Sequence, residues 1–219
     1  MQSETQSFVQ LGHRADQPHS LSSNNAMSLL IDSRQQLWVG TTNGLNRKVP
    51  GRDAFVQYVH RDTDSTSISS SHITCFLEDR QHRLWIGTRD GGLNLMRPDQ
   101  RSFRHYTMAQ GLPSNTVFGI REDQQGLLWI STDNGLAQLD PDQSKIISYN
   151  KHDGLVCKEF TSNSTHRDAN GYFYFGGYDG IVYFHPDSIR RDTARPRLAF
   201  TQLRGFNEPV TSLSSADID

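Results

Sequence analysis

Cysteine, long apolar runs and net charge are all scarce in this sequence of 219 residues, and each shortage excludes a class of protein. The two cysteines, Cys75 and Cys157, are too few for a disulfide framework or a zinc site. No run of about 18 apolar residues exists, so no segment is expected to cross a membrane as a helix. Lys and Arg number 22 against 24 Asp and Glu, and this balance argues against a nucleic-acid partner.

Targeting and catalytic signals are missing as well. The first residues lack a basic region followed by an apolar one, so no signal peptide is visible. There is no Gly-x-Ser-x-Gly, His-Glu-x-x-His or phosphate loop, and we therefore predict no catalytic residue, no metal and no cofactor. Residues 62–66 are rich in side-chain oxygens but lack the glycine and the distal glutamate of a calcium loop. Asn163-Ser164-Thr165 fits the glycosylation acceptor pattern, which is common by chance.

What the sequence does have is an internal repeat, present four times. Its most recognisable part is a segment of five mostly apolar residues whose second residue is aromatic, and we call this aromatic residue the anchor. Successive anchors lie 47, 44 and 45 residues apart. The four anchors are Trp38, Trp85, Trp129 and Tyr174. A fixed period of this length indicates a repeat architecture in which each copy is one supersecondary unit.

Two residues keep a constant distance from each anchor. An aspartate stands six residues before it and a glycine six residues after it, and the glycine follows Asn or Asp in every copy. The aspartates are Asp32, Asp79, Asp123 and Asp168, and the glycines are Gly44, Gly91, Gly135 and Gly180. Asn-Gly and Asp-Gly favour the centre of a two-residue hairpin turn, where both residues need a positive φ. The aspartate is expected in the preceding turn, bonded to its own backbone.

Each repeat therefore has four short strands joined by tight turns, which is the pattern of a propeller blade. We predict an all-β fold, a partial β-propeller over residues 1–190 with four blades of four antiparallel strands. The blades are expected at about 21–60, 68–107, 112–150 and 155–189. The repeated tryptophans are interpreted as core residues between sheets and not as a sugar-binding ladder, and Cys75 as a small core residue.

Residues 8–11 stand thirteen positions before the connector of the first blade, as the last strand of that blade stands before the next connector. They are predicted to be the orphan outer strand of a blade whose other strands are absent, whereas the fourth blade lacks an outer strand. Two alternatives follow: these residues close the ring on the fourth blade, or the array is cut from a longer one. Because open strand edges promote pairing, we expect self-association through the open blade edges.

The pattern Glu-Asp-x-x-x-x-Leu-Trp-Ile-Gly-Thr-x-x-Gly-Gly-Leu-Asn at 78–94 resembles the two-component regulator propeller repeat. The connectors, such as Leu112-Pro113-Ser114-Asn115, are similar to that family too. Residues 171–186 look like the last blade of such an array, and 191–219 like a linker and the beginning of an Ig-like domain. The resemblance thus places the chain at the C-terminal part of a propeller.

This resemblance implies a function. Such propellers form the periplasmic sensor region of bacterial inner-membrane receptors with a histidine kinase, or sometimes a diguanylate cyclase, on the other side. Several are thought to sense oligosaccharides, so a small-molecule or oligosaccharide ligand and a membrane-anchored parent protein are expected. Alternatives that remain open are a propeller enzyme of the lyase or glycan-degrading type and a dimerisation scaffold without a ligand.

Candidate ligand-binding residues are sought where the repeats differ, because loops on a repeated scaffold carry function. The variable positions are the tips of the hairpins that follow each anchor. Weak candidates at these tips are Arg89, Asp90, Asp133 and Tyr178, which offer charge and an aromatic face suited to a sugar.

Overall fold

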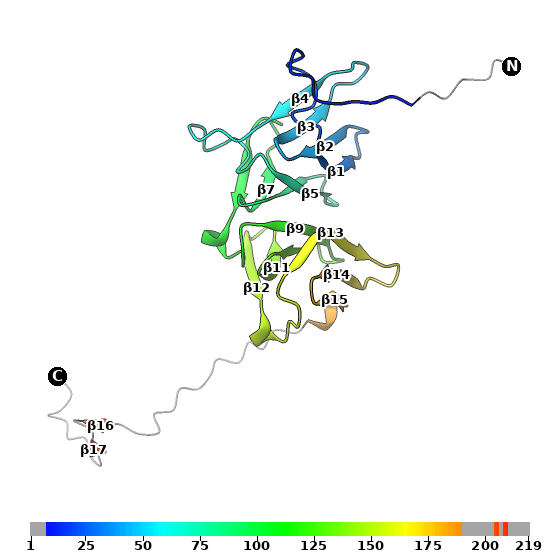
Figure 1. Ribbon diagram of the computed structural model, residues 1–219. Helices are drawn as coiled ribbons and strands as arrows, with labels where there is room; N and C mark the ends of the chain where they lie inside the picture. Colours follow the sequence, from blue (N-terminus) through cyan, green and yellow to red (C-terminus); the bar gives the residue numbers. More distant parts are fainter. Residues whose placement is uncertain (1–7, 190–203, 206–207, 210–219) are drawn as a thin grey trace. The chain divides into compact units, whose positions relative to one another are not determined.

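The structure, a computed structural model, describes residues 8–189, 204–205 and 208–209. Residues 8–188 belong to one compact unit, in which four antiparallel sheets follow one another in chain order (Figure 1), and a separate unit starts at Ile189. Within the first unit the innermost strands of successive sheets lie side by side. This arrangement of blade-like sheets confirms the predicted all-β propeller architecture.

Each of the first three sheets has four strands in the spatial order in which they occur in the chain. Sheet 1 contains β1 (Ala26–Ile31), β2 (Leu37–Thr41), β3 (Gly44–Lys48) and β4 (Phe55–Tyr58). Sheet 2 contains β5 (Ile73–Glu78), β6 (Leu84–Thr88), β7 (Leu93–Met96) and β8 (Phe103–Tyr106). Sheet 3 contains β9 (Val117–Glu122), β10 (Leu128–Thr132), β11 (Gly135–Asp140) and β12 (Lys145–Tyr149).

The fourth sheet departs from the four-stranded pattern and has three strands, which confirms the expectation that the fourth blade lacks an outer strand. These are β13 (Phe160–Arg167), β14 (Phe173–Gly177) and β15 (Gly180–Phe184), and β15 is the free edge. The missing strand follows from the sequence: after β15 the chain enters a short 3-10 helix, Pro186–Ser188, where the other repeats carry an outer strand. Two further 3-10 helices, Met108–Gln110 and Lys151–Asp153, lie in the connectors before sheets 3 and 4.

The hairpin turns stand where the sequence places them but differ in geometry. In sheets 1, 3 and 4 the two turn residues precede the glycine, and the glycine is the first strand residue, opposite Thr41, Thr132 or Gly177. Gly44 has φ +144 and Gly135 has φ +114, while the preceding asparagines do not adopt positive φ. In sheet 1 a side-chain clamp holds this turn, since the Thr41 hydroxyl accepts from the Asn43 N–H at 3.1 Å and donates to the Gly44 carbonyl at 3.0 Å.

The hydrophobic core lies between the sheets. Three clusters of buried side chains fill the boundaries between sheets 1 and 2, 2 and 3, and 3 and 4. Each tryptophan belongs to the cluster shared with the following sheet, and Trp38, Trp85 and Trp129 are 2%, 0% and 1% exposed. This confirms that the tryptophans are core residues, and Cys75 is buried in the second of these boundaries as predicted.

Residues 8–11 form no strand, which corrects the expectation of an orphan outer strand there. Phe8 and Val9 are fully and 72% exposed, and no strand of the described residues pairs with them. The predicted linker and Ig-like beginning, 191–219, lie mostly outside the described residues. Within the described part of that segment, β16 (Arg204–Gly205) and β17 (Glu208–Pro209) form a short antiparallel pair.

Candidate functional site

The repeated aspartate fixes the loop that precedes every anchor strand. In sheet 2, Asp79 Oδ1 accepts from the backbone N–H groups of Gln81 and Arg83, both at 2.9 Å. Its Oδ2 accepts from the Trp85 indole Nε1 at 2.8 Å. The same bond joins the aspartate and the anchor in the other sheets at 2.9, 2.9 and 3.2 Å, the last from the Tyr174 hydroxyl. One carboxylate therefore holds both the turn and the core aromatic residue.

A buried asparagine fixes the opposite end of the strands in sheets 1 and 2. Asn46, which is fully buried on β3, accepts from the Ser22 N–H at 2.9 Å and donates to the Ser22 hydroxyl and to the Val39 carbonyl. Asn94 binds Ser69 in the same way in sheet 2. In sheet 3 the equivalent residue is Ala137, so this connector lacks the amide clamp. The connector and the anchor hairpin of sheets 1 and 2 thus form one rigid end.

We define the hairpin-tip face as the four tips together with the four connectors that precede their sheets. A backbone hydrogen bond joins tip to connector in each sheet, and these bonds have similar lengths. They run from Thr42 N to Asn25 O at 3.2 Å, from Arg89 N to His72 O at 2.9 Å, from Asp133 N to Thr116 O at 3.4 Å, and from Tyr178 N to Glu159 O at 3.1 Å. The repetition brings all four variable tips to the same end of their sheets.

The four sequence-predicted residues are exposed on this face, two at the tip of sheet 2 and one each at the tips of sheets 3 and 4. Asp90 accepts from the Thr116 hydroxyl at 3.2 Å, which ties the second tip to the third connector. Tyr178 is 79% exposed at the fourth tip. Within the described residues, no hydrogen bond or ion pair joins any two of Arg89, Asp90, Asp133 and Tyr178. They share a face and do not form a cluster.

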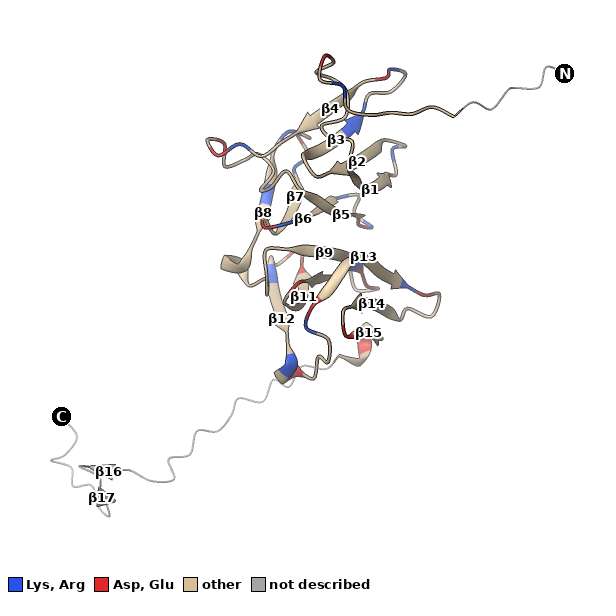
Figure 2. Ribbon diagram, viewed as in Figure 1, with Lys and Arg blue, Asp and Glu red and all other residues tan. Residues whose placement is uncertain are grey.

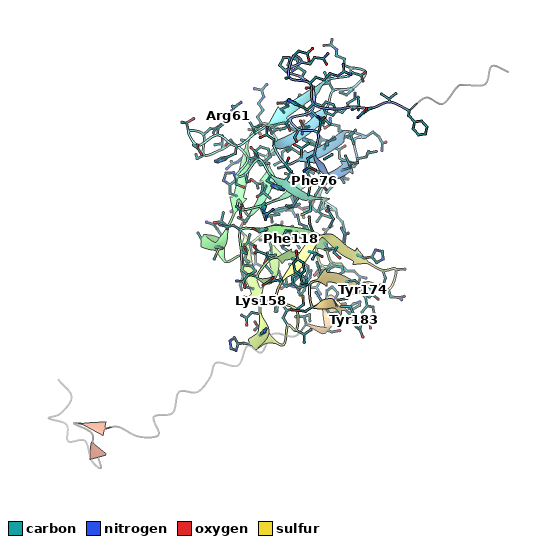
Figure 3. The ribbon with its side chains drawn as sticks, in the orientation of Figure 1. Arg61, Phe76, Phe118, Lys158, Tyr174 and Tyr183 are labelled. Atoms are coloured by element: carbon teal, nitrogen blue, oxygen red, sulfur yellow. The ribbon has the colours of Figure 1, made fainter. Side chains whose placement is uncertain are left out.

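Sequence reasoning missed a hollow of about 370 Å³ on this face, beside the third tip. Its lining includes Asn134 from the tip, Leu155 from the fourth connector and three exposed basic side chains. The basic residues are Lys151, His152 and Lys158, the last labelled in Figure 3. The signal available in the sequence was the length of the fourth connector, which differs from the other three. The hollow suits a polar or anionic ligand.

Charge does not gather elsewhere into a surface of one sign. Lys and Arg are interspersed with Asp and Glu along the sheets and loops in the view of Figure 2. In the searched part of the chain, no three His, Cys, Asp or Glu side chains come together as a metal site would require. Asp64, in the oxygen-rich loop, uses Oδ1 to accept from the Thr66 N–H and hydroxyl, so it closes its own loop. None of the described residues forms a helix long and apolar enough to cross a membrane.

Comparison with known proteins identifies the repeat. The sequence profile of the family described as two component regulator propeller matches residues 20–43, 67–90 and 111–134. Each match begins at a connector and ends at a hairpin tip. It therefore covers the connector, the repeated aspartate and the anchor strand, which together position the hairpin-tip face. Each match begins one residue before the expected start of one of the first three blades.

A curated relative extends the match over most of the chain. Histidine kinase P4 of Formosa agariphila is 32% identical over 216 residues, which cover 94% of this chain and 15% of the kinase. The chain therefore spans about one seventh of the length of this relative.

Two solved structures share the fold. Each is described as the extracellular domain of a hybrid two-component system of B. thetaiotaomicron. They superpose with TM-scores of 0.68 and 0.67 at 22% and 21% identity. The matches cover 78% and 81% of this chain but 23% and 25% of those domains. The chain therefore contains two-component regulator propeller repeats and is homologous to a segment of Histidine kinase P4.

Proposed function

We propose that this chain is part of the extracytoplasmic, ligand-sensing propeller of a bacterial membrane receptor that carries a histidine kinase. The observation that carries the proposal is the 32% identity with a histidine kinase across 94% of the chain. The fold shared with two extracellular domains of two-component systems supports a location outside the cytoplasm, in the periplasm. In this proposal the chain binds a signal and performs no catalysis of its own.

The hairpin-tip face is the proposed ligand surface, and the hollow beside the third tip is its most concave part. Lys151, His152 and Lys158 can donate to hydroxyl or carboxylate oxygens, and the Asn134 amide can do so beside them. Such a lining fits a small polar molecule, an oligosaccharide among them. The rigid clamps below the tips would transmit the occupancy of this face to the sheets.

The experiment is to express the complete reading frame that contains this chain and to assay its membranes. We expect a membrane-spanning helix and a histidine kinase after residue 219, and phosphate transfer from ATP to the receptor. Formation of a cyclic dinucleotide from GTP would assign the output to a diguanylate cyclase. A reading frame with no membrane-spanning segment and no kinase or cyclase would overturn the receptor proposal.

A further inference from the structure

A hollow of about 380 Å³ lies between sheets 1 and 2, at the end of the anchor strands opposite to the hairpin-tip face. One wall is the turn of sheet 1 that holds the repeated aspartate, with Asp32 and Arg34. The other wall belongs to sheet 2 and comes from the loop before β6 and the turn after β7. Because both walls belong to adjacent sheets of one array, the hollow borders neither end of the array. We call it the aspartate-turn hollow.

Long side chains bridge the equivalent place at the next boundary, between sheets 2 and 3. Arg80 comes directly after the repeated aspartate of sheet 2, and its guanidinium donates to the Gln124 carbonyl of sheet 3 at 2.9 Å. Arg83, three residues further on, donates to the carboxylate of Asp142, in the turn between β11 and β12, at 3.1 Å. Two arginines of sheet 2 thus reach across to sheet 3 at this end of the strands.

Sheet 1 has shorter and uncharged side chains at these two positions, Ser33 and Gln36. Ser33 donates to Glu78 of sheet 2 from its N–H at 2.7 Å and from its hydroxyl at 2.6 Å. The side-chain oxygen of Gln36 is buried and has no hydrogen-bond partner among the described residues. The space that arginine side chains bridge at the next boundary is therefore open between sheets 1 and 2.

The charged groups of the hollow that lack a partner are cations. Arg34 and Arg97 are both exposed, and their guanidinium groups form no hydrogen bond or ion pair with the described residues. His82 is a third basic residue of the lining, with Nδ1 3.4 Å from Glu78 Oε1. Arg97 follows the last residue of β7, and the equivalent residue of sheet 3 is Asp140. The hollow therefore carries a positive charge where the next boundary carries a negative one.

The two carboxylates that line the hollow are already bonded by the protein. Asp32 accepts from two backbone N–H groups of its own turn and from the Trp38 indole. Glu78 accepts from the N–H and the hydroxyl of Ser33, and its side chain is only 16% exposed. The two guanidinium groups of the lining therefore keep their donors for a molecule that enters from solvent. Guanidinium groups match the geometry of oxyanions and bind them through two parallel hydrogen bonds.

We propose that the aspartate-turn hollow binds a small organic anion, whose carboxylate or sulfate group is held by Arg34 and Arg97. Leu84, Met96 and Pro98 form the apolar part of the lining, against which the carbon skeleton of the ligand packs. The volume of the hollow lies at the lower end of the range for small-molecule sites, so the ligand is compact. This site is separate from the hairpin-tip face and does not depend on what that face binds.

The first test follows the indole N–H of Trp38, which lines the hollow and donates to Asp32 at 2.9 Å. The sequence has three tryptophans, so the NMR spectrum of the isotope-labelled full chain shows three indole signals. Glucuronate and inorganic sulfate are the probes, and glucose at matched ionic strength is the neutral comparison. We expect a saturable shift of the Trp38 signal with at least one anion and none with glucose, while Trp85 and Trp129 stay unchanged. The anion that binds more tightly identifies the group, carboxylate or sulfate.

The second test assigns the binding to the two arginines. Arg34→Gln with Arg97→Gln should raise the dissociation constant of the anion roughly tenfold or more, because two charged donors are lost. Both residues are exposed, so the double variant should keep its melting temperature. The matched control is Arg61→Gln, since Arg61 is exposed in the connector after β4 and outside the lining (Figure 3). No saturable shift with either anion, an equal shift with glucose, or an unchanged dissociation constant in the double variant would overturn the proposal.

Discussion

At the scale of single residues, the repeated aspartate does two tasks with one carboxylate. Its two oxygens are used separately, one for the turn and one for the anchor, and this explains why the spacing of six is constant. At Asp79 the guanidinium of Arg83 adds an ion pair, with Nε 2.6 Å from Oδ2. Burial works to lower the pKa of Arg83, but the bonds and charges of Asp79 and Asp142 outweigh it and raise that pKa.

Replacing this carboxylate should destabilise the fold in proportion to its burial. Asp79→Ala leaves a buried indole N–H, two backbone N–H groups and Arg83 without their acceptor. We expect a loss of roughly 3 kcal/mol of unfolding free energy. Asp32→Ala is the matched control, because Asp32 makes the same three bonds in a more exposed setting and without the arginine. Its loss should be about 1 kcal/mol in urea unfolding, and equal losses would contradict this view.

Cys75 gives a residue-scale probe of the core between sheets 2 and 3. Burial raises the pKa of its thiol to about 12, so almost no thiolate exists in the folded protein at neutral pH. A thiol reagent should modify Cys75 only as fast as the chain opens, and urea should abolish this protection. Rapid modification of Cys75 in the native chain, followed by mass spectrometry of its peptide, would contradict the tight boundary.

At the scale of elements, the sheets are joined by apolar clusters and, at the first two boundaries, by a glutamate that precedes the repeated aspartate. Glu122 on β9 accepts from Arg80 N and lies 3.7 Å from Arg80 Nε. Burial nevertheless raises the pKa of Glu122 above its usual value. The folded chain therefore holds this proton more tightly than the unfolded chain, and the ionised form costs stability as the pH rises through the folded pKa.

Glu122→Gln tests whether ionisation of Glu122 lowers the stability of the folded chain. Glutamine keeps an oxygen for the Arg80 N–H but does not ionise. The wild-type chain should lose stability relative to the variant as the pH is raised from about 4 to about 7. The measurement is the urea midpoint of both proteins at both pH values. If the wild type gains stability relative to the variant over that range, the ion pair with Arg80 dominates and the assignment is wrong.

Most strands and turns could be located from the sequence, because the same spacing of residues occurs four times. The strands around the anchors and the burial of the tryptophans followed from spacing alone. The turn geometry did not, since the threonine clamp that holds the turn before Gly44 is a side-chain contact without a signature in the Asn-Gly pair. The absence of a strand at residues 8–11 was not foreseen either, because pattern alone does not show whether a strand has a partner.

At the scale of the whole molecule, the candidate ligand face is set by differences between repeats, which carry no period. Arg89, Asp90, Asp133 and Tyr178 were found as variable tips, and the structure places them on one face without joining them. The basic hollow beside Asn134 was not found, because Lys151, His152 and Lys158 meet only when the fourth connector folds against the third tip.

Substitution of the lysines that line the hollow tests its role in ligand binding. Lys151→Ala with Lys158→Ala removes two exposed cations from one connector and should leave the melting temperature within about a degree, since exposed charges contribute little to stability. Binding of an acidic or neutral oligosaccharide to the chain should weaken by roughly tenfold. Arg89→Ala, at a tip remote in sequence from the hollow, is the comparison. Unchanged titration curves for the double variant would exclude the hollow as the ligand site.

The central claim is that this propeller segment senses a ligand and does not transform it. The most direct measurement is calorimetric titration of the chain with a panel of acidic and neutral oligosaccharides, followed by mass spectrometry of each ligand after long incubation. A sensing propeller should show saturable binding of at least one oligosaccharide, which is recovered with its mass unchanged. Recovery of shortened or unsaturated products, formed in proportion to the amount of protein, would contradict it and assign the chain to the propeller lyases or glycan-degrading enzymes.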